Sequence, residues 1–203
     1  MYKIIKRIID FIVSLLAITV LSPVFIITAI AVKADSKGPV LFVQKRVGKN
    51  KSHFNMYKFR TMRTDTPHDM PTHLLKDPEA FITKVGKFLR KSSLDELPQL
   101  INILKGDMSI VGPRPALWNQ DDLIAERDKY GANNIRPGLT GWAQVNGRDE
   151  LEIDVKAKFD GEYVEKMSLP FDIKCIINTA LQVVKHEGVV EGGTGTLDKT
   201  DKE

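Results

Sequence analysis

An apolar run from Phe11 to Val32 constrains the fold of this chain more than any other feature of its sequence. It is slightly longer than the roughly 20 residues that an α-helix needs to cross the hydrocarbon core of a bilayer. A cleaved signal peptide is the weaker alternative, because its apolar part has only about 7 to 15 residues. The sequence therefore predicts a membrane helix near the start of the chain.

The middle of this run carries Ser22-Pro23. Proline lacks a backbone N–H and disfavours helical geometry in the residue before it, so we expect a bend here. Because basic flanks favour the cytoplasmic side, a helix that enters the membrane, turns and returns would suit basic residues on both sides. A kinked helix that crosses the membrane stays open as the alternative. The flanking basic residues are Lys3, Lys6, Arg7, Lys33, Lys37, Lys45, Arg46, Lys49 and Lys51.

Composition narrows the function less than position does. The 203 residues suffice for one packed domain, and the net charge of +4 suits anionic lipid, nucleic acid or a phosphorylated substrate. The single cysteine, Cys175, lies in an apolar stretch, so we expect a buried thiol, no intramolecular disulfide and no cysteine-rich metal site. The four histidines lack metal-ligand spacing and are interpreted as solvated or structural; they are His53, His68, His73 and His186.

After the membrane run, the pattern alternates short strands and helices. Two apolar segments around the polar stretch 48–52 predict a β-hairpin, and the Pro-, His- and Asp-rich segment 64–76 predicts a loop. A basic amphipathic helix is expected over about 81–91, either covering the core or lying in the lipid headgroup plane. Gly112-Pro113-Arg114-Pro115 and Arg136-Pro137-Gly138 are interpreted as rigid turns. Further helices are expected over about 97–105, 120–130, 156–167 and 172–185.

The segment from Ser93 to Leu100 holds the most informative candidate residues. Ser93 and Glu96 match a capping box, and Pro98 is tolerated only in a first helical turn, so a helix should begin between Ser93 and Leu97. Asp95 and Glu96 then belong to its N-terminus. Two carboxylates there could simply complement the helix dipole, or could serve as a nucleophile and its partner where backbone N–H groups also favour a phosphate.

Basic residues beside rigid turns favour the second interpretation. A carboxylate that attacks a diphosphate must overcome repulsion between anions, which requires fixed cations and a divalent metal ion. Arginine suits this role because its planar guanidinium binds phosphate oxygens in pairs. The sequence contains no glycine-rich loop of NTPases, no dinucleotide fingerprint, no HExxH and no Gly-x-Ser-x-Gly motif. The candidate cations are Lys58, Arg60, Arg114, Arg136 and Arg148.

Several motifs follow one another in order between Lys6 and about Lys185. They are Lys6-Arg7-Ile8-Ile9-Asp10, Ser22-Pro23, Gly38-Pro39-Val40-Leu41-Phe42, Tyr57-Lys58-Phe59-Arg60-Thr61-Met62, Ser93-Leu94-Asp95-Glu96-Leu97-Pro98-Gln99-Leu100, Val111-Gly112-Pro113-Arg114-Pro115, the segment from Arg136 to Arg148, and Lys158-Phe159-Asp160. In these motifs the chain resembles the small monotopic phosphoglycosyl transferases that begin bacterial glycoconjugate assembly, including protein N-glycosylation.

The resemblance implies an α+β fold. It has an N-terminal re-entrant membrane helix broken at Ser22-Pro23, interfacial amphipathic helices, and a compact helical domain associated with a β-hairpin. The implied division is a re-entrant helix at 1–35, a catalytic domain at 36–187 and a flexible tail at 188–203. The expected location is the bacterial inner membrane, with the catalytic domain on the cytoplasmic face.

The resemblance also implies a reaction. Asp95 is expected to attack the β-phosphate of a UDP-sugar, release UMP and carry the phosphosugar until polyprenyl (undecaprenyl) phosphate takes it, which gives ping-pong kinetics. Mg²⁺ is the expected cofactor with Asp95 as a ligand, and Glu96 would assist the carrier's attack or hold the metal. The candidate substrate- and phosphate-binding residues are Lys58, Arg114, Arg136, Arg148 and Asp160.

The expected partners are the two substrates and the lipid bilayer, without nucleic acid, and downstream glycosyltransferases are further candidates. Two other classes stay open. One is a membrane-anchored protein whose basic face binds lipid or nucleic acid, and the other is a phosphohydrolase in which water replaces the lipid phosphate. No residue pattern names the sugar, and no role is carried over to Arg60 or to the tail.

Overall fold

In the computed structural model, the described residues are 2–66, 79–147 and 151–185, with side chains described up to 183. The tail 188–203 and most of the predicted loop 64–76 lie outside these ranges. The helices are α1 (Tyr2–Val20), α2 (Ser22–Asp35), α3 (Lys84–Ser92), α4 (Gln99–Lys105), α5 (Asp121–Asp128), α6 (Ile153–Lys166) and α7 (Leu169–Lys185). The strands are β1 (Leu41–Val47), β2 (His53–Phe59), β3 (Ser109–Val111) and β4 (Gly138–Thr140). Short 3₁₀ turns are η1 (Lys49–Lys51), η3 (Glu79–Phe81), η4 (Leu94–Glu96), η5 (Ala132–Asn134) and η6 (Gln144–Asn146).

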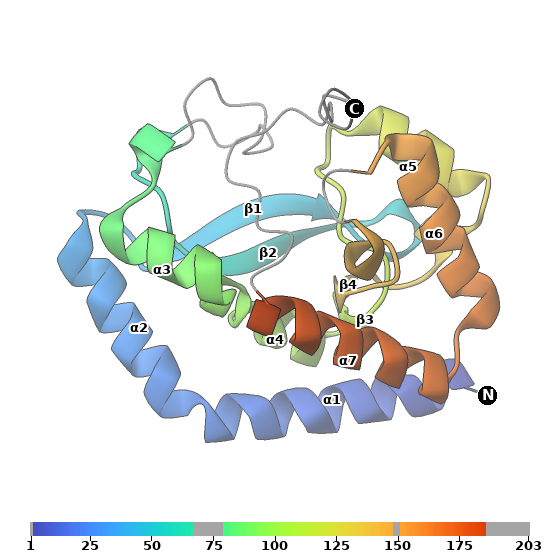
Figure 1. Ribbon diagram of the computed structural model, residues 1–203, viewed down its shortest axis with the longest axis horizontal. Coiled ribbons are helices and arrows are strands. Elements are labelled where there is room, and N and C mark those ends of the chain that lie inside the picture. The colour runs from blue at the N-terminus through green and yellow to red at the C-terminus, as the bar shows by residue number, and fades with distance from the viewer. Residues whose placement is uncertain (1, 67–78, 148–150, 186–203) are drawn as a thin grey trace, which may run out of the picture.

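The α+β prediction is confirmed, and each helix expected after residue 80 is present with ends displaced by no more than about one turn. The hairpin is present as well, with antiparallel pairing from Leu41 opposite Phe59 to Val47 opposite His53. Figure 1 shows α1 and α2 along one side of the molecule, with α3, α4 and α7 between them and the hairpin. α5 and α6 pack together at the end of the molecule away from α2 (Figure 1). Cys175 is buried and His53 is exposed, as predicted.

The predicted bend lies between α1 and α2. Pro23 has no N–H for the carbonyl four residues earlier, which belongs to Thr19, and the Ser22 hydroxyl donates to that carbonyl instead at 2.8 Å. Pro23 then stands in the first turn of α2, where its missing donor costs nothing. Among the described helices none alone has the length and hydropathy of a membrane span, whereas α1 and α2 together do, with a bend of 64° between them.

Both N-terminal helices contribute to the apolar clusters of the domain. Ala17, Ile18 and Phe25 pack against a buried cluster that includes Met56 and Ile103. Val32 is part of a second buried cluster, formed with Phe59 and Leu89. The hairpin, α3 and α4 therefore share their core with α1 and α2.

The inward face of α1 is polar and its outward face is apolar. The buried residues of α1 are Lys6, Asp10 and Ser14, which follow one another at intervals of about one turn. Its exposed side chains are mostly apolar, and they include Ile4, Ile5, Ile8, Phe11, Ile12, Val13, Leu15, Leu16 and Val20. This distribution is the reverse of that on a surface helix of a protein surrounded by water.

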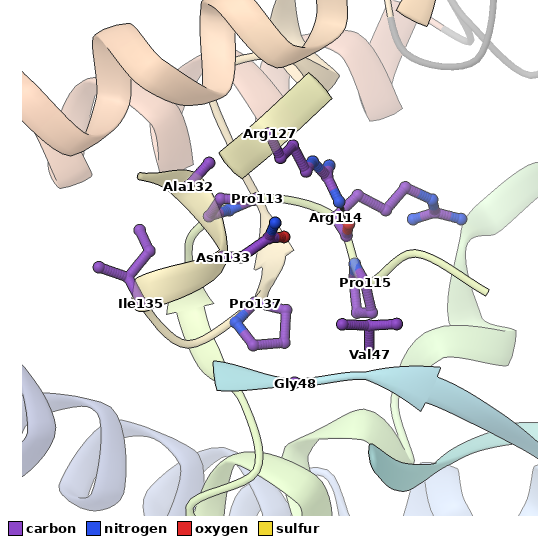
Figure 2. Close-up of a pocket in the computed structure, with 10 residues that line it drawn as sticks. All are labelled: Val47, Gly48, Pro113, Arg114, Pro115, Arg127, Ala132, Asn133, Ile135 and Pro137. Carbon is purple, nitrogen blue, oxygen red and sulfur yellow. Dashed lines mark hydrogen bonds between the residues drawn. The ribbon is translucent and has the colours of Figure 1, made fainter. Parts of the chain in front are cut away.

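The three-residue strands β3 and β4, which the sequence analysis did not predict, pair in parallel, with Ser109 beside Gly138 and Val111 beside Thr140. Gly112 and Gly138 allow the two backbones to approach this closely. A Cβ on Gly138 would lie 2.1 Å from the Gly112 nitrogen, so even alanine would force the backbones apart. β3 leads directly into the turn Pro113-Arg114-Pro115, which packs between the end of β1 and α5 (Figure 2).

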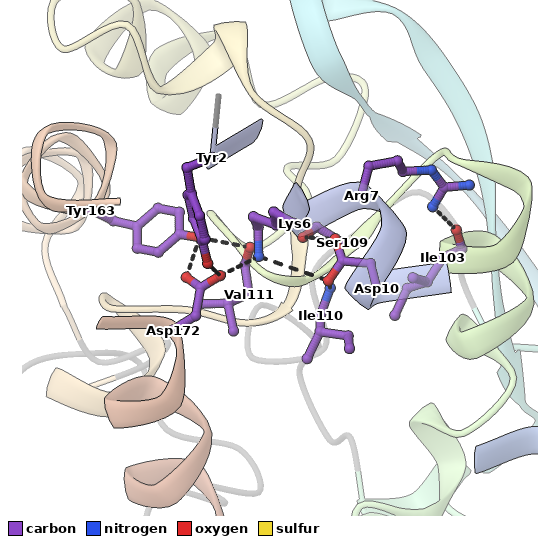
Figure 3. A network of polar contacts seen from close by, with 10 residues as sticks. All are labelled: Tyr2, Lys6, Arg7, Asp10, Ile103, Ser109, Ile110, Val111, Tyr163 and Asp172. Atoms are coloured by element: carbon purple, nitrogen blue, oxygen red, sulfur yellow. Dashed lines mark hydrogen bonds and ion pairs between the residues drawn. The ribbon is translucent and has the colours of Figure 1, made fainter. Parts of the chain in front are cut away.

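A buried polar network fastens the start of α1 to the domain (Figure 3). Lys6 Nζ lies 2.6 Å from Asp172 Oδ2 of α7, and the same oxygen accepts a hydrogen bond from the Tyr2 hydroxyl at 2.6 Å. The Tyr163 hydroxyl lies 2.7 Å from the other oxygen of Asp172. On the next turn, Asp10 accepts from the Ser109 hydroxyl at 2.6 Å. Lys6 and Asp10 on the polar face of α1 therefore have partners in α7 and β3, and Tyr163 of α6 bonds the partner of Lys6.

The predicted capping box is wrong. Ser93 has left-handed backbone geometry with φ of 56°, ends α3, and makes no side-chain capping bond to the following turn. Glu96 instead pairs with side chains from other parts of the chain. The helix proper begins at Gln99, so Asp95 and Glu96 lie in the 3₁₀ turn η4 before it.

Candidate active site

The turn η4 holds the two carboxylates between apolar anchors. Leu94 packs against the cluster of Val32, Phe59 and Leu89, and Leu97 packs against the same cluster and its neighbour. Because both leucines face the core, the intervening Asp95 and Glu96 are turned towards the edge of the hairpin. Both are half-buried.

Glu96 joins two basic side chains that are far apart in sequence. Its Oε1 lies 2.7 Å from Lys58 Nζ of β2 and 3.3 Å from Arg114 Nη2 of the Pro-Arg-Pro turn. Burial opposes the ionisation of Glu96, but the two cations outweigh it and hold the pKa of Glu96 well below its usual range. Glu96 is therefore an anion that orients both cations beside Asp95.

Asp95 has a different environment. Burial raises the pKa of Asp95 to about 6, Lys58 opposes this shift, and the negative charge of Glu96 adds to it. Arg90 of α3 and Arg114 also lower the pKa of Asp95. A partly dehydrated carboxylate beside several cations is a competent nucleophile above that pH, because it is ionised yet poorly solvated.

The structure brings together four of the charged side chains considered from the sequence, and it places others elsewhere. Asp95, Glu96, Lys58 and Arg114 meet at η4, whereas Arg148 lies outside the described residues. Ser22 and Pro23 lie at the bend between α1 and α2, as predicted.

Arg136 lies at the far end of α4. Its Nε donates to the Gly106 carbonyl at 2.8 Å, just after α4 ends, while Glu96 stands just before α4 begins. The seven residues of α4 separate them by roughly 10 Å at 1.5 Å per residue. Arg136 Nε therefore satisfies a helix-terminal carbonyl, and the expected phosphate-binding role stays a prediction.

Asp160 is buried in α6 with 1% of its surface exposed. Its Oδ2 pairs with Arg127 of α5, at 2.6 Å from Nη2 and 2.8 Å from Nε. Asp160 is thus held inside the fold by an ion pair with Arg127. Its expected place among the substrate- and phosphate-binding residues stays a prediction.

The donor set at η4 suits one kind of metal ion. Within the described ranges, no three His, Cys, Asp or Glu side chains lie close enough to hold a metal by themselves. Mg²⁺ does not need such a cluster, because it commonly takes one or two carboxylates together with water and substrate phosphates. Asp95 is the carboxylate that fits, since Glu96 is already paired with Lys58 and Arg114.

Comparison with known proteins decides the family. Residues 1–186 match the family model described as bacterial sugar transferase. The chain belongs to the bacterial sugar transferase family. This chain is 37% identical to EpsL, an uncharacterized sugar transferase of Bacillus subtilis strain 168, over 97% of this chain and 95% of that protein.

Two further relatives carry names that state a reaction. One is the UDP-glucose:undecaprenyl-phosphate glucose-1-phosphate transferase of Escherichia coli K12, 39% identical over 89% of this chain and 40% of the relative. The other is the UDP-N-acetylgalactosamine-undecaprenyl-phosphate N-acetylgalactosaminephosphotransferase of Aeromonas hydrophila, 38% identical over 88% of this chain and 43% of the relative. The sugar transferase thus spans about two-fifths of the length of these two relatives.

The sequence analysis did not assign two arginines, Arg90 and Arg127, to the candidate active site or its surroundings. Arg90 was assigned only to a basic amphipathic helix, although its position in the last turn of α3 brings its charge to Asp95. Arg127 was not singled out at all, because nothing in its neighbourhood marks it as buried. Its proximity to Asp160 in space is the signal, and only the packing of α5 on α6 reveals it.

Proposed function

We propose that this sugar transferase moves a phosphosugar from a UDP-sugar to polyprenyl phosphate through a covalent intermediate on Asp95. The observation that carries the proposal is the pairing of Glu96 with Lys58 and Arg114 beside Asp95. The names of the relatives support the substrates, since they specify UDP-sugars and undecaprenyl phosphate. The names of the relatives specify different sugars, so the sugar of this protein should be identified by measuring UMP release from a panel of UDP-sugars.

In the first half-reaction, the Asp95 carboxylate attacks the β-phosphorus of the UDP-sugar. The bond between that phosphorus and the oxygen bridging to the α-phosphorus breaks, and UMP leaves with the electron pair. Lys58 and Arg114 offset the charge that gathers on the phosphate oxygens, and Glu96 keeps both cations in place. The phosphosugar remains on Asp95 as an acyl phosphate.

In the second half-reaction, a phosphate oxygen of the polyprenyl phosphate attacks the same phosphorus. The acyl phosphate bond breaks, Asp95 recovers its carboxylate, and polyprenyl diphosphosugar leaves. Dividing the transfer in this way lets one set of cations serve a water-soluble donor and a lipid acceptor in turn. We further propose Mg²⁺ as the cofactor, held by Asp95 and the substrate phosphates, where it would supply a Lewis acid that neutralises the diphosphate.

The covalent step can be tested directly. The purified transferase is incubated with the UDP-sugar that is labelled in its sugar, without any lipid acceptor, and is then denatured and digested. We expect the label on the peptide that contains Asp95, and its transfer to lipid when undecaprenyl phosphate is added before denaturation. A phosphohydrolase would release the labelled phosphosugar into water without the acceptor, and a lipid- or nucleic-acid-binding protein would release no UMP.

The pKa of Asp95 gives a pH prediction. Because only the ionised carboxylate attacks, kcat/KM should rise as pH rises through about 6 and should be roughly tenfold lower at pH 5 than at pH 7. Binding of Mg²⁺ to the carboxylate favours ionisation, so raising its concentration should move the midpoint to lower pH. The measurement is kcat/KM from pH 5 to 8 at two Mg²⁺ concentrations.

The raised pKa of Asp95 also makes the free energy of unfolding depend on pH, and here the effect of rising pH is unfavourable. The folded-state pKa of Asp95 is raised, so between pH 4 and 6 the folded protein binds more protons than the unfolded chain, and the contribution of Asp95 to stability falls as pH rises. The unfolding free energy of Asp95→Asn minus that of the wild type should therefore grow over this range. A difference that is constant with pH would contradict the raised pKa.

We also propose that α1 and α2 form a re-entrant helix in the cytoplasmic leaflet of the inner membrane. Both ends of the pair are tied to one domain, by Lys6 with Asp172 at one end and by Asp35 with the Val85 N–H at the other. A single crossing would carry those ends to opposite sides of the bilayer. The apolar outward face of α1 and the exposed Phe88 of α3 support contact with lipid.

Cysteine labelling tests this topology. Lys3 and Lys37 are exposed on either side of the bent pair, and Cys175 is buried, so the background should be low. Lys3→Cys and Lys37→Cys should both react with a membrane-impermeant maleimide in inside-out vesicles and not in intact cells. Lys49→Cys in the hairpin turn is the control for the cytoplasmic side. Labelling of Lys3→Cys in intact cells would show a spanning helix instead.

A further inference from the structure

The turn that carries Arg114 is held from behind by two other arginines. Arg127 Nη1 donates to the Arg114 carbonyl at 2.9 Å, and Arg46 Nη1 donates to the Pro115 carbonyl at 2.9 Å. Figure 2 shows the Arg127 guanidinium beside the main chain of Arg114, while the Arg114 side chain extends away from it. Two consecutive carbonyls of the turn are thus fixed by cationic donors.

Each of these arginines is fixed in turn by its own acceptor. Arg127 Nε and Nη2 lie 2.8 and 2.6 Å from Asp160 Oδ2. Arg46 Nε and Nη2 lie 3.1 and 2.5 Å from Gln44 Oε1, within the strand β1. One guanidinium therefore connects α6 to the Arg114 carbonyl, and the other connects β1 to the next carbonyl.

Packing of α5 against α6 does not require an ion pair. Arg127 and Asp160 have 3% and 1% of their surfaces exposed, and the cost of dehydrating two such charges can match or exceed their attraction. Apolar side chains of similar size would join the helices as well. What an apolar pair could not provide is the third bond of the guanidinium, to the main chain of the Arg114 turn.

The two prolines make that third bond effective. Pro113 and Pro115 have fixed φ angles, so the turn has little freedom to absorb a displacement of its carbonyls. A shift of the Arg114 main chain therefore moves the Arg114 side chain, whose Nη2 lies 3.3 Å from Glu96 Oε1. Displacements of about 1 Å at a positioning contact can lower a rate roughly 100-fold.

We propose that Arg127 and Asp160 are a positioning pair that aims Arg114 at the Asp95–Glu96 turn, with Arg46 and Gln44 as a second support of the same turn. The proposal rests on the function proposed above for Arg114. It gives Asp160 a role in the reaction that needs no contact with substrate.

The test uses the double variant Arg127→Gln with Asp160→Asn. It leaves no unpaired charge in the core, and the shorter glutamine side chain cannot join α6 to the Arg114 carbonyl. We expect kcat/KM for UMP release to fall roughly 10- to 100-fold with the protein still folded. Asn133→Ala is the matched control, because the buried Asn133 side chain bonds to Ile124 and Asp128 of α5; its kcat/KM should stay within about twofold of the wild type.

A double-mutant cycle distinguishes positioning from general destabilisation. If the pair acts through Arg114, the same double variant in an Arg114→Ala background should lower kcat/KM no more than about twofold further. Equal factors in the two backgrounds would overturn the inference while leaving the proposed reaction intact.

A crystal structure provides a readout that does not depend on activity. In the Arg127→Gln/Asp160→Asn variant, the contact between Arg114 and Glu96 should be lost, while the contact between Lys58 and Glu96 remains. An Arg114 side chain that has not moved in this variant would overturn the inference, whether or not the wild-type protein releases UMP. Absence of UMP release from the wild type would refute only the proposed function.

Discussion

Asp95→Asn should lower the rate of UMP release by more than roughly 1,000-fold, because a neutral amide oxygen is a much weaker nucleophile towards phosphorus than a carboxylate oxygen. Asparagine has nearly the same shape as aspartate, so the apolar anchors Leu94 and Leu97 should hold η4 unchanged. The substitution also removes the cost of keeping a charge in a half-buried position. The variant should therefore fold at least as well as the wild type at neutral pH, which separates loss of chemistry from loss of structure.

Asp107→Asn is the matched control for this experiment. Asp107 follows α4 at the end opposite η4, is partly buried, and pairs with Lys105 at 3.7 Å. Its replacement should leave UMP release close to the wild-type rate. UMP release that survives in Asp95→Asn would assign the nucleophile to another residue and remove the basis for the covalent mechanism.

Asp172→Asn should lower the free energy of unfolding by about 3 to 5 kcal/mol, the usual cost of breaking a buried ion pair from one side. Its carboxylate lies within 2.7 Å of donors on Tyr2, Lys6 and Tyr163. The substitution leaves the Lys6 ammonium buried without its closest anion. Thermal unfolding in detergent or nanodiscs should show a midpoint lower by on the order of 10 °C.

Two comparisons keep this result interpretable. Lys6→Met combined with Asp172→Asn removes both charges and should recover part of the lost stability. Asp65→Asn breaks the exposed pair with Arg63, whose side chain is 58% exposed, and should change the midpoint little. A midpoint for Asp172→Asn equal to that of Asp65→Asn would mean that the network does not fasten α1.

Local sequence signals were sufficient where structure depends on neighbours in the chain. The bend follows from Pro23, the hairpin from two apolar segments around a polar turn, and the helices from their periodicity. The sequence indicated Glu96 as part of a charged site, and in the structure it contacts Lys58 and Arg114, which lie 38 and 18 residues away. Lys58 and Arg114 were selected as candidate cations because of neighbouring rigid turns and the family resemblance.

The remaining features depend on contacts that a one-dimensional pattern does not contain. The strands β3 and β4 are three residues each and pair across a long separation, so neither has a periodicity of its own. Ser93 matches a capping motif, but the end of α3 requires left-handed geometry there, and Glu96 gains more from two cations than from a backbone N–H. The contacts of Arg136 with the Gly106 carbonyl and of Asp160 with Arg127 likewise join segments that are far apart in the sequence, so no local pattern predicts them.

The inverted faces of α1 and the clusters it shares with the hairpin limit how this enzyme can be simplified. A fragment starting at residue 36 would lose Phe25 and Val32 from its interior and would leave Asp172 without Lys6. The remaining fragment would expose Met56, Phe59 and Leu89, so it would be prone to aggregate in water. The bent pair of α1 and α2 and the rest of the domain are therefore one folding unit. A more polar version would have to be obtained by replacing the apolar residues on the outer surface of the bent pair with polar residues while keeping its inner surface unchanged.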